Sequence, residues 1–513
     1  METKPKSYAK DFYIWRYLSQ DITPKQSYEA ISQVKYLNKK ILYRFITKTK
    51  DKNLLDYKRC LKLKTSKLID QKPYCIEIGL SIYDATKLSS KELENTIKKF
   101  DDKSVYSDFR QKLQILNSKD KFTKLQNMDK KLFFDIFNQC GKKYRVKYFD
   151  KPFSLNLIKK LKDDRQFATT IQLIVTNPKM EIAQNSLLDL NLTKINFDYK
   201  VSFLLSINSI KYHKNSIALA YLTRAYKKAY YKFDKDNILF WQYQLTKDTK
   251  YLDKLASSWD INIYSLYAKD IKNLNYTAKY SIPQVVKPTS YNTTDPFSWL
   301  KVLKDIKKLD KQKLKYYENI FTTKDTLPHL TFLYERFTRY KTSYFILPYE
   351  KYLKNYTTKR KAMIYAIARQ ESRFIPSSIS SAYAMGATQI MPFLSKAIAK
   401  DLKEPYDIDK QLDIKTNLKY ANYQINYLTK KLHNPLFIAY AYNGGIGFTR
   451  NILRHNNLFG KGIFEPYLSM ELIPYDETKR YGKKVLANYF IYINYLNQKK
   501  VRFGKFINQL FND

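Results

Sequence analysis

Hydrophobic positions in the first half of the chain recur every three to four residues within short segments, a spacing that predicts helices rather than strands. Three such segments follow one another closely: SIALAYLTRAYKKAYYKF at 216–233, NILFWQYQLTKD at 237–248 and TKYLDKLA at 249–256. Short helices this close together form hairpins, and hairpins that cannot bury both faces alone stack on their neighbours. We therefore expect an irregular α-solenoid or superhelix, with a compact helical bundle as the alternative because no strict repeat period is visible.

Composition changes twice further along the chain. Residues 281–299 concentrate Pro, Ser, Thr and Asn, which predicts a linker or long loop before a small helical module. Eight of the ten glycines fall between Gly386 and Gly504, in a segment of lysozyme-like size with Gly-containing turns. We predict a mainly all-α chain with three parts: a helical solenoid at 1–265, a helical linker domain at 266–342 and a catalytic domain at 343–513.

The charge of the chain is strongly positive, with 93 Lys and Arg against 47 Asp and Glu. Such a field favours nucleic acid, anionic lipid or carboxylate-rich polymers such as peptidoglycan, and a merely solvated lysine coat is the alternative. The sequence has no zinc-ligand spacing, no basic region followed by heptads and no glycine-aromatic RNA-binding motif. We therefore expect no nucleic acid partner.

Cysteine and histidine usage points away from metal or cofactor chemistry. Cys60, Cys75 and Cys140 are too few for a disulfide framework, and nothing in the sequence supports a Cys60–Cys75 bridge over free thiols. The four histidines lie far apart and show no metal-ligand spacing, so we expect no metal and no cofactor. The sequence predicts no membrane span and shows no signal peptide, which leaves a cytoplasmic protein or a secreted one whose signal was removed.

One carboxylate stands out on a predicted helix at KAMIYAIARQESRF, 361–374. Glu371 continues the apolar stripe of Ile364, Ile367 and Phe374 at helical spacing, so its side chain should face the core. Pro376 follows closely and ends the helix, which places Glu371 near the negative end of the helix dipole. Burial and dipole both raise the pKa of the carboxyl, and a carboxylic acid that stays protonated near neutral pH can protonate a leaving glycosidic oxygen.

The alternative for Glu371 is a structural one, in which it reaches solvent or pairs with Arg369 or Arg373. Three further blocks argue against it, since SSISSAYAMGATQIMP, AYNGG at 441–445 and ETKRYG at 477–482 follow Glu371 in order. Together the four blocks resemble the soluble lytic murein transglycosylases, over roughly residues 345–500. The sequence departs from the family pattern at three places. Ala387-Thr388 stands where Leu-Met is common, Gly445 where alanine is common, and Gly482 where an apolar residue often follows the tyrosine.

The resemblance implies a lysozyme-like catalytic domain with Glu371 as its catalytic residue. It also implies a set of substrate-binding residues: Ser380, Gln389, Met391, Tyr442, Asn443, Glu477 and Tyr481. From the residues themselves some of these have structural alternatives: Ser380 can cap a turn, Gln389 can stabilise one, Met391 can pack in the core and Glu477 can act as a structural hydrogen bonder. Gly386 permits a positive φ or a close backbone approach, and Tyr440 is expected in the core rather than at the substrate.

The activity implied is cleavage of the MurNAc–GlcNAc β-1,4 bond of peptidoglycan by transglycosylation, which leaves 1,6-anhydro-MurNAc ends. A lysozyme-type hydrolase and a non-catalytic glycan-binding helical scaffold remain alternatives. The resemblance further implies a solenoid that closes into a ring, a periplasmic location after removal of a signal, and peptidoglycan strands as the partner. We expect a monomer with no membrane span, and cell-wall proteins are the protein partners that this function allows.

Overall fold

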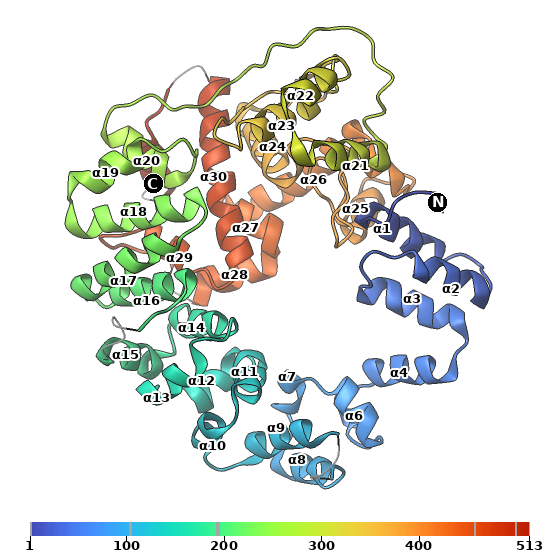
Figure 1. Ribbon diagram of the computed structural model, residues 1–513, viewed down its shortest axis with the longest axis vertical. Helices are drawn as coiled ribbons and strands as arrows, with labels where there is room; N and C mark the ends of the chain where they lie inside the picture. The colour runs from blue at the N-terminus through green and yellow to red at the C-terminus, as the bar shows by residue number, and fades with distance from the viewer. Residues whose placement is uncertain (1–2, 102–104, 191–194, 456–457, 498–499, 512–513) are drawn as a thin grey trace. The chain divides into compact units, whose positions relative to one another are not determined.

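The computed structural model (Figure 1) is helical in its regular structure, as the sequence predicted. It describes residues 3–101, 105–190, 195–455, 458–497 and 500–511. Within these ranges there is no β-strand, only isolated bridges such as Lys279 with Tyr344. The predicted mainly all-α class is confirmed.

The chain forms two compact units. The first contains residues 1–17, 33–37 and 230–513, and the second contains residues 18–32 and 38–229. The boundaries expected after residues 265 and 342 both fall inside the first unit and stay predictions.

The second unit is a succession of short helices, most of which pack on a neighbour in sequence, as the predicted helical hairpins require. Polar caps begin many of them. Ser89, for example, accepts from the Glu92 amide while the Glu92 carboxylate accepts from Ser89. The helices are α2 Pro24–Ser32, α3 Lys39–Thr49, α4 Lys52–Lys62, α5 Thr65–Leu68, α6 Pro73–Gly79, α7 Ile82–Ala85, α8 Ser90–Ile97, α9 Ser107–Asn117, α10 Lys121–Asn127, α11 Lys130–Gln139, α12 Lys142–Phe149, α13 Leu155–Leu161, α14 Phe167–Val175, α15 Glu181–Asp189, α16 Tyr199–Lys211 and α17 Asn215–Lys228.

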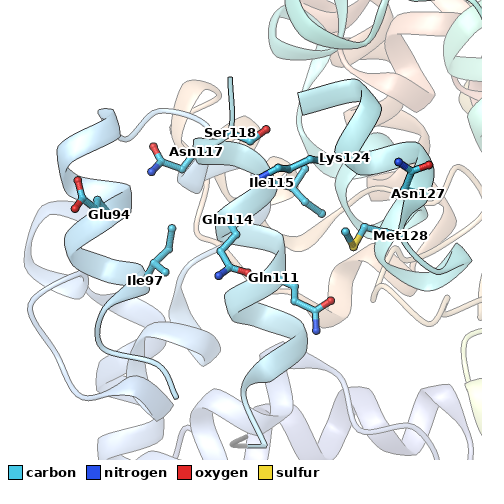
Figure 2. Close-up of a pocket in the computed structure, with 10 residues that line it drawn as sticks. All are labelled: Glu94, Ile97, Gln111, Gln114, Ile115, Asn117, Ser118, Lys124, Asn127 and Met128. Atoms are coloured by element: carbon cyan, nitrogen blue, oxygen red, sulfur yellow. The ribbon is translucent and has the colours of Figure 1, made fainter. Parts of the chain in front are cut away.

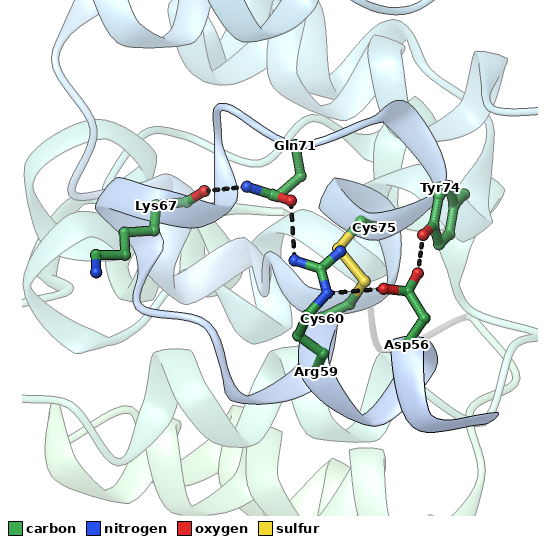
Figure 3. Close-up of a disulfide and its surroundings, with 7 residues drawn as sticks. All are labelled: Asp56, Arg59, Cys60, Lys67, Gln71, Tyr74 and Cys75. Atoms are coloured by element: carbon green, nitrogen blue, oxygen red, sulfur yellow. Dashed lines mark hydrogen bonds and ion pairs between the residues drawn. A yellow bond between two sulfur atoms is a disulfide. The ribbon is translucent and has the colours of Figure 1, made fainter. Parts of the chain in front are cut away.

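A disulfide joins α4 to α6 in this unit (Figure 3). Cys60 and Cys75 are both fully buried, with their Cα atoms 5.2 Å apart. Beside them Arg59 donates to Asp56 at 2.7 Å and to Gln71 at 2.9 Å, which ties α4 to the turn before α6, and Tyr74 of α6 donates to Asp56. Cys140 is buried and has no disulfide partner, and burial raises the pKa of its thiol to about 11.

The first unit holds the whole C-terminal part of the chain. Its centre is formed by α24 against α30, with α27 packed on α30 and α26 packed on both α24 and α27. The helices are α1 Tyr8–Tyr17, α18 Lys232–Thr246, α19 Thr249–Ala256, α20 Ile263–Ile271, α21 Pro296–Asp305, α22 Lys311–Glu318, α23 Leu327–Phe337, α24 Thr358–Ser372, α25 Pro392–Asp401, α26 Ile414–Leu432, α27 Pro435–Gly444, α28 Ile446–His455, α29 Tyr467–Glu471, α30 Asp476–Asn497 and α31 Phe503–Phe511, with 3-10 turns at Ile306–Lys308, Glu350–Tyr352 and Asp409–Leu412.

The N-terminal helix α1 belongs to this unit although the main part of the unit begins only at residue 230. Its aromatic face packs on Tyr383, with ring centroids 5.8 Å away for Phe12 and 5.4 Å for Trp15. Arg16 donates to both oxygens of Asp409, at 2.6 and 2.7 Å. The start of the chain is therefore attached to the segment that carries the predicted catalytic residues.

The small module of α21, α22 and α23 has its own apolar core, in which Trp299, Phe321 and Leu330 are buried. The preceding segment, 274–295, contains no helix, in agreement with most of the linker predicted at 281–299, but α21 already begins at Pro296 and includes the last four of those residues. Searched over the described residues, no helix combines the length and the apolar character needed to cross a membrane.

Candidate active site

Glu371 lies in the last turn of α24, one residue before the helix ends at Ser372. Ile364 and Ile367, on the predicted stripe of this helix, are fully buried. Two consecutive residues after the helix, Arg373 and Phe374, have φ angles of 53° and 67° in the left-handed region. This turn reverses the chain directly after Glu371, and the helix stops before Pro376 as expected.

The pKa of the Glu371 carboxyl group is raised from 4.5 to about 7. Burial is the largest cause, a hydrogen bond from Tyr481 opposes the shift, and the charge of Glu477 adds to it. Tyr481 Oη donates to Glu371 Oε1 at 2.8 Å. A protonated carboxyl with Oε1 occupied as acceptor carries its proton on Oε2, and the role of Glu371 as the acid stays a prediction.

Two helices, α27 and α30, bring four of the predicted residues near this carboxyl. Tyr481 is buried on α30, where burial and the charge of Glu371 raise the pKa of its phenol well above the usual value. Tyr442, near the end of α27, donates to the Thr388 carbonyl at 2.9 Å. Asn443 donates to Glu477 at 3.3 Å, and its own oxygen accepts from a threonine of α30. Tyr442 and Tyr481 are both close enough to Glu371 for its charge to raise their pKa.

The loop after α24 is built around Gly386. Its φ is 80°, and a Cβ there would lie 2.3 Å from the Gln411 carbonyl oxygen, so both expected reasons for glycine apply. Gln389 directs its amide hydrogens into the same loop, to Ser378 O at 3.2 Å and Gly386 O at 2.8 Å. This bonding is the turn-stabilising alternative for Gln389, and it leaves the side-chain oxygen as the atom available to a substrate.

A cavity of about 240 Å³ lies beside Glu371. The loop after α24 contributes Ser378 and Gln389 to its wall, and α21 contributes Trp299. The N-terminal part of the chain also contributes residues to the wall of this cavity: Ser7, Tyr8, Ala9 and Lys35. Glu371 therefore opens onto an enclosed space shaped by parts of the chain that are far apart in sequence.

Comparisons with known proteins agree with this geometry. Residues 349–462 match the model of the transglycosylase SLT domain. This segment of the chain is therefore similar to an SLT domain. The soluble lytic murein transglycosylase of Escherichia coli K12 is 34% identical over 157 residues, 29% of this chain, and that of Salmonella typhimurium is 32% identical over 141 residues, 26% of this chain. These matches cover 24% and 21% of the two relatives, about a quarter of their length or less. The resemblance expected from the four motif blocks is confirmed.

The fold of the SLT-containing chain also has a solved counterpart. An inactive mutant of the lytic transglycosylase Slt from Pseudomonas aeruginosa superposes with a TM-score of 0.52 at 15% identity, covering 95% of this chain and 87% of that one. Identity this low shows a shared fold alone.

The structure decides what the arginines flanking the SLT-domain glutamate do. Arg369 Nη2 lies 2.7 Å from Glu335 Oε1, and Arg373 Nε lies 2.5 Å from Glu335 Oε2. Glu335, on α23 of the small helical module, also accepts from the Tyr344 amide at 3.0 Å. Burial alone would raise the pKa of this carboxyl, but the two arginines together hold it below the usual value. The bonded partner of both arginines is therefore Glu335 rather than Glu371.

Sequence reasoning missed Glu335, Tyr8 and Lys35. Glu335 lies in TLPHLTFLYERFTRY, where a glutamate beside an arginine looks like an ordinary surface pair. Helical spacing gave no signal for it, since Glu335 lies two and five residues after the buried Leu333 and Leu330 rather than three or four. Tyr8 and Lys35 carry no local signal at all.

The remaining predicted residues occupy the SLT-domain loop and its edges. Ser380 Oγ accepts from the Ala384 amide at 2.9 Å, which is the turn-capping alternative, and its contact with sugar stays a prediction. Met391 is half-buried and precedes Pro392 at the start of α25, and its substrate contact also stays a prediction. Tyr440 is fully buried as expected. A Cβ at residue 482 would lie 2.1 Å from its ring, which explains why this chain has glycine there.

Proposed function

We propose that this protein is a lytic transglycosylase that cleaves the MurNAc–GlcNAc β-1,4 bond of peptidoglycan without water and leaves 1,6-anhydro-MurNAc ends. The observation that carries the proposal is a half-buried Glu371 with a pKa of about 7 at the end of an SLT-domain helix, facing a cavity. At neutral pH about half of such carboxyl groups are protonated, so one group can give and then take a proton.

In the proposed reaction Glu371 Oε2 gives its proton to the glycosidic oxygen as the bond to C1 of MurNAc breaks. The N-acetyl carbonyl of the same sugar stabilises the positive charge that develops at C1. Glu371, now a carboxylate, removes the proton from the C6 hydroxyl, whose oxygen attacks C1 and closes the anhydro ring. Tyr481 supports both stages, because its hydrogen bond to Oε1 fixes the carboxyl and stabilises the carboxylate. An attacking group within the substrate has a high effective concentration, so no water needs to be positioned.

Glu477 is the residue on which a lysozyme-type hydrolase would depend, since such enzymes use a second carboxylate. The carboxylate of Glu477 is exposed and is bonded by Asn443 at 3.3 Å. Its charge reaches Glu371 and raises the pKa of that group, which helps to keep the acid protonated. We therefore assign Glu477 to substrate positioning and to tuning of Glu371, and not to nucleophilic attack.

The proposed place of action is the periplasm or cell wall. Disulfides persist in oxidising compartments, among them the bacterial periplasm, and are rare in the cytosol. The Cys60–Cys75 disulfide and the peptidoglycan substrate both support this location. The large positive charge of the chain would retain a polymer whose peptide stems carry carboxylates.

Mass spectrometry of digested sacculi tests the proposal, with Glu371→Gln beside the unmodified protein. We expect anhydro-muropeptides, each lighter by one water than the corresponding reducing product, and no products from the variant. Reducing ends alone would establish a hydrolase instead. Full activity of Glu371→Gln would remove Glu371 from the mechanism, and binding without any product would leave the scaffold alternative.

A further inference from the structure

The second unit contains a groove of about 560 Å³ between α8, α9 and α10, in the range of pockets that hold small ligands (Figure 2). Gln111 and Gln114, three residues apart on α9, line it together with Ser118, which follows the end of the helix. Asn117 at the end of α9 and Asn127 at the end of α10 add two more amides. Four amide side chains therefore converge on one recess.

The polar groups of this groove lack partners within the protein. In the described part of the chain, the side chains of Gln111, Gln114 and Asn127 make no hydrogen bond. Asn117 Oδ1 and Ser118 Oγ are shielded from solvent and also lack a partner. Polar atoms that are shielded from solvent normally have hydrogen-bond partners. A small side-chain rotation toward a ligand would give these two atoms a partner, and no existing hydrogen bond would be broken. This state is what a binding site for a polar ligand requires.

The charge of the groove differs from that of the molecule. The chain has a net charge of +46, yet the ten lining residues include one lysine, Lys124, and one glutamate, Glu94, which pairs with Lys98 at 2.8 Å. A site for carboxylates or phosphates would instead gather cations. Each amide offers both a donor and an acceptor, which matches the hydroxyl and acetamido groups of an amino sugar. Apolar side chains complete the lining and can pack on sugar C–H faces: Ile97, Ile115 and Met128.

We propose that this groove is a second glycan-binding site, which holds the uncharged sugar backbone of the peptidoglycan strand. The choice of this ligand rests on the proposed function, whereas the groove itself is independent of Glu371. It would keep the polymer attached to the enzyme while the SLT domain cleaves. The peptide stem is the competing ligand within the same polymer, and the groove lacks the cations that its carboxylates would need.

The test uses the full chain with Glu371→Gln, so that the ligand stays intact, and a peptide-free GlcNAc–MurNAc tetrasaccharide in isothermal titration. The lactyl carboxyl groups of this tetrasaccharide are amidated, so that it is uncharged. The groove variant is Gln111→Met with Gln114→Met, which keeps length and helix propensity but removes both amides. The matched control is Gln126→Met, on α10 but outside the groove lining. Thermal unfolding of each variant confirms that it is folded.

We expect two binding events for the Glu371→Gln protein and for the control. In the groove variant one event should weaken about tenfold, the loss expected for two neutral hydrogen bonds. In the active enzyme the groove variant should raise KM on sacculi and leave kcat unchanged. Identical titrations would overturn the proposal, and so would a variant that weakens only peptide-bearing fragments. The two proposals can fail separately. If the active enzyme gave no anhydro products, the proposed reaction would be wrong, but binding of the tetrasaccharide to the groove would still be expected.

Discussion

The phenol of Tyr481 donates a 2.8 Å hydrogen bond to Oε1 of Glu371, across 110 residues of sequence. α30 carries the tyrosine and α24 carries the acid, and these helices pack against each other at the centre of the first unit. The bond lowers the pKa of Glu371, whereas burial and the charge of Glu477 raise it. The balance of these effects places the pKa near neutrality, which is what a group that both gives and takes a proton needs.

Tyr481→Phe should raise the pKa of Glu371, because it removes the interaction that favours the carboxylate. We expect the alkaline limb of the pH–rate profile to move to higher pH and kcat to fall roughly 10- to 100-fold, the worth of one hydrogen bond to a charged group. Tyr489→Phe, on the same helix, is the control and should leave both unchanged. An alkaline limb that stays in place would show that the phenol does not act on Glu371.

Glu335→Gln should destabilise the protein and also shift its pH profile. The variant leaves Arg369 and Arg373 without a carboxylate in a buried setting, a loss worth ~3–5 kcal/mol when one partner of a buried pair is removed. The unbalanced positive charge near the end of α24 should lower the pKa of Glu371, so the alkaline limb should move to lower pH. Denaturant titration and pH–rate profiles measure the two effects. Glu350→Gln, which changes an exposed glutamate, is the control. If Glu335→Gln lost stability but kept the pH–rate profile of the unmodified protein, Glu335 would have a purely structural role.

Gly482→Ala should disturb the site through Tyr440. The added methyl would lie 2.1 Å from the Tyr440 ring on α27, the helix that also carries Tyr442. Overpacking of this kind costs ~1–3 kcal/mol or more. Gly447→Ala is the matched control, since nothing lies within 4 Å of a Cβ there and the residue is helical. Equal thermal stabilities for the two variants would contradict the packing seen around Gly482.

Glu371→Gln should stabilise the protein above neutral pH while it abolishes activity. The pKa of Glu371 is raised from 4.5 to about 7 on folding, so its ionisation costs stability that grows as pH rises from 4.5 to about 7 and then levels off. A neutral glutamine avoids this cost. Because the carboxyl is only partly shielded from solvent, we expect a gain of ~1–2 kcal/mol at pH 8 and none at pH 4. Equal free energies of unfolding at pH 8 would argue against the raised pKa, and the exposed Glu350→Gln serves as the control.

The part of the site that the sequence predicted is the part encoded locally. Helical spacing placed Glu371 in the core, and the requirement for a left-handed turn singled out Gly386. The Glu335–arginine cluster and the wall formed by Tyr8 and Lys35 depend on contacts between distant segments. Arg16 and Asp409, for example, are 393 residues apart. No period or motif within one segment can reveal such contacts, and a single sequence gives no pairing information.

The central claim is that the pKa of Glu371 lies near neutral pH. The pH dependence of kcat/KM on a soluble murein fragment tests it most directly, because this ratio reports the pKa of the essential acid in the free enzyme. We expect kcat/KM to fall about tenfold per pH unit above an apparent pKa of about 7. A decline that begins near pH 4.5, or a rate that stays constant to pH 9, would contradict the account.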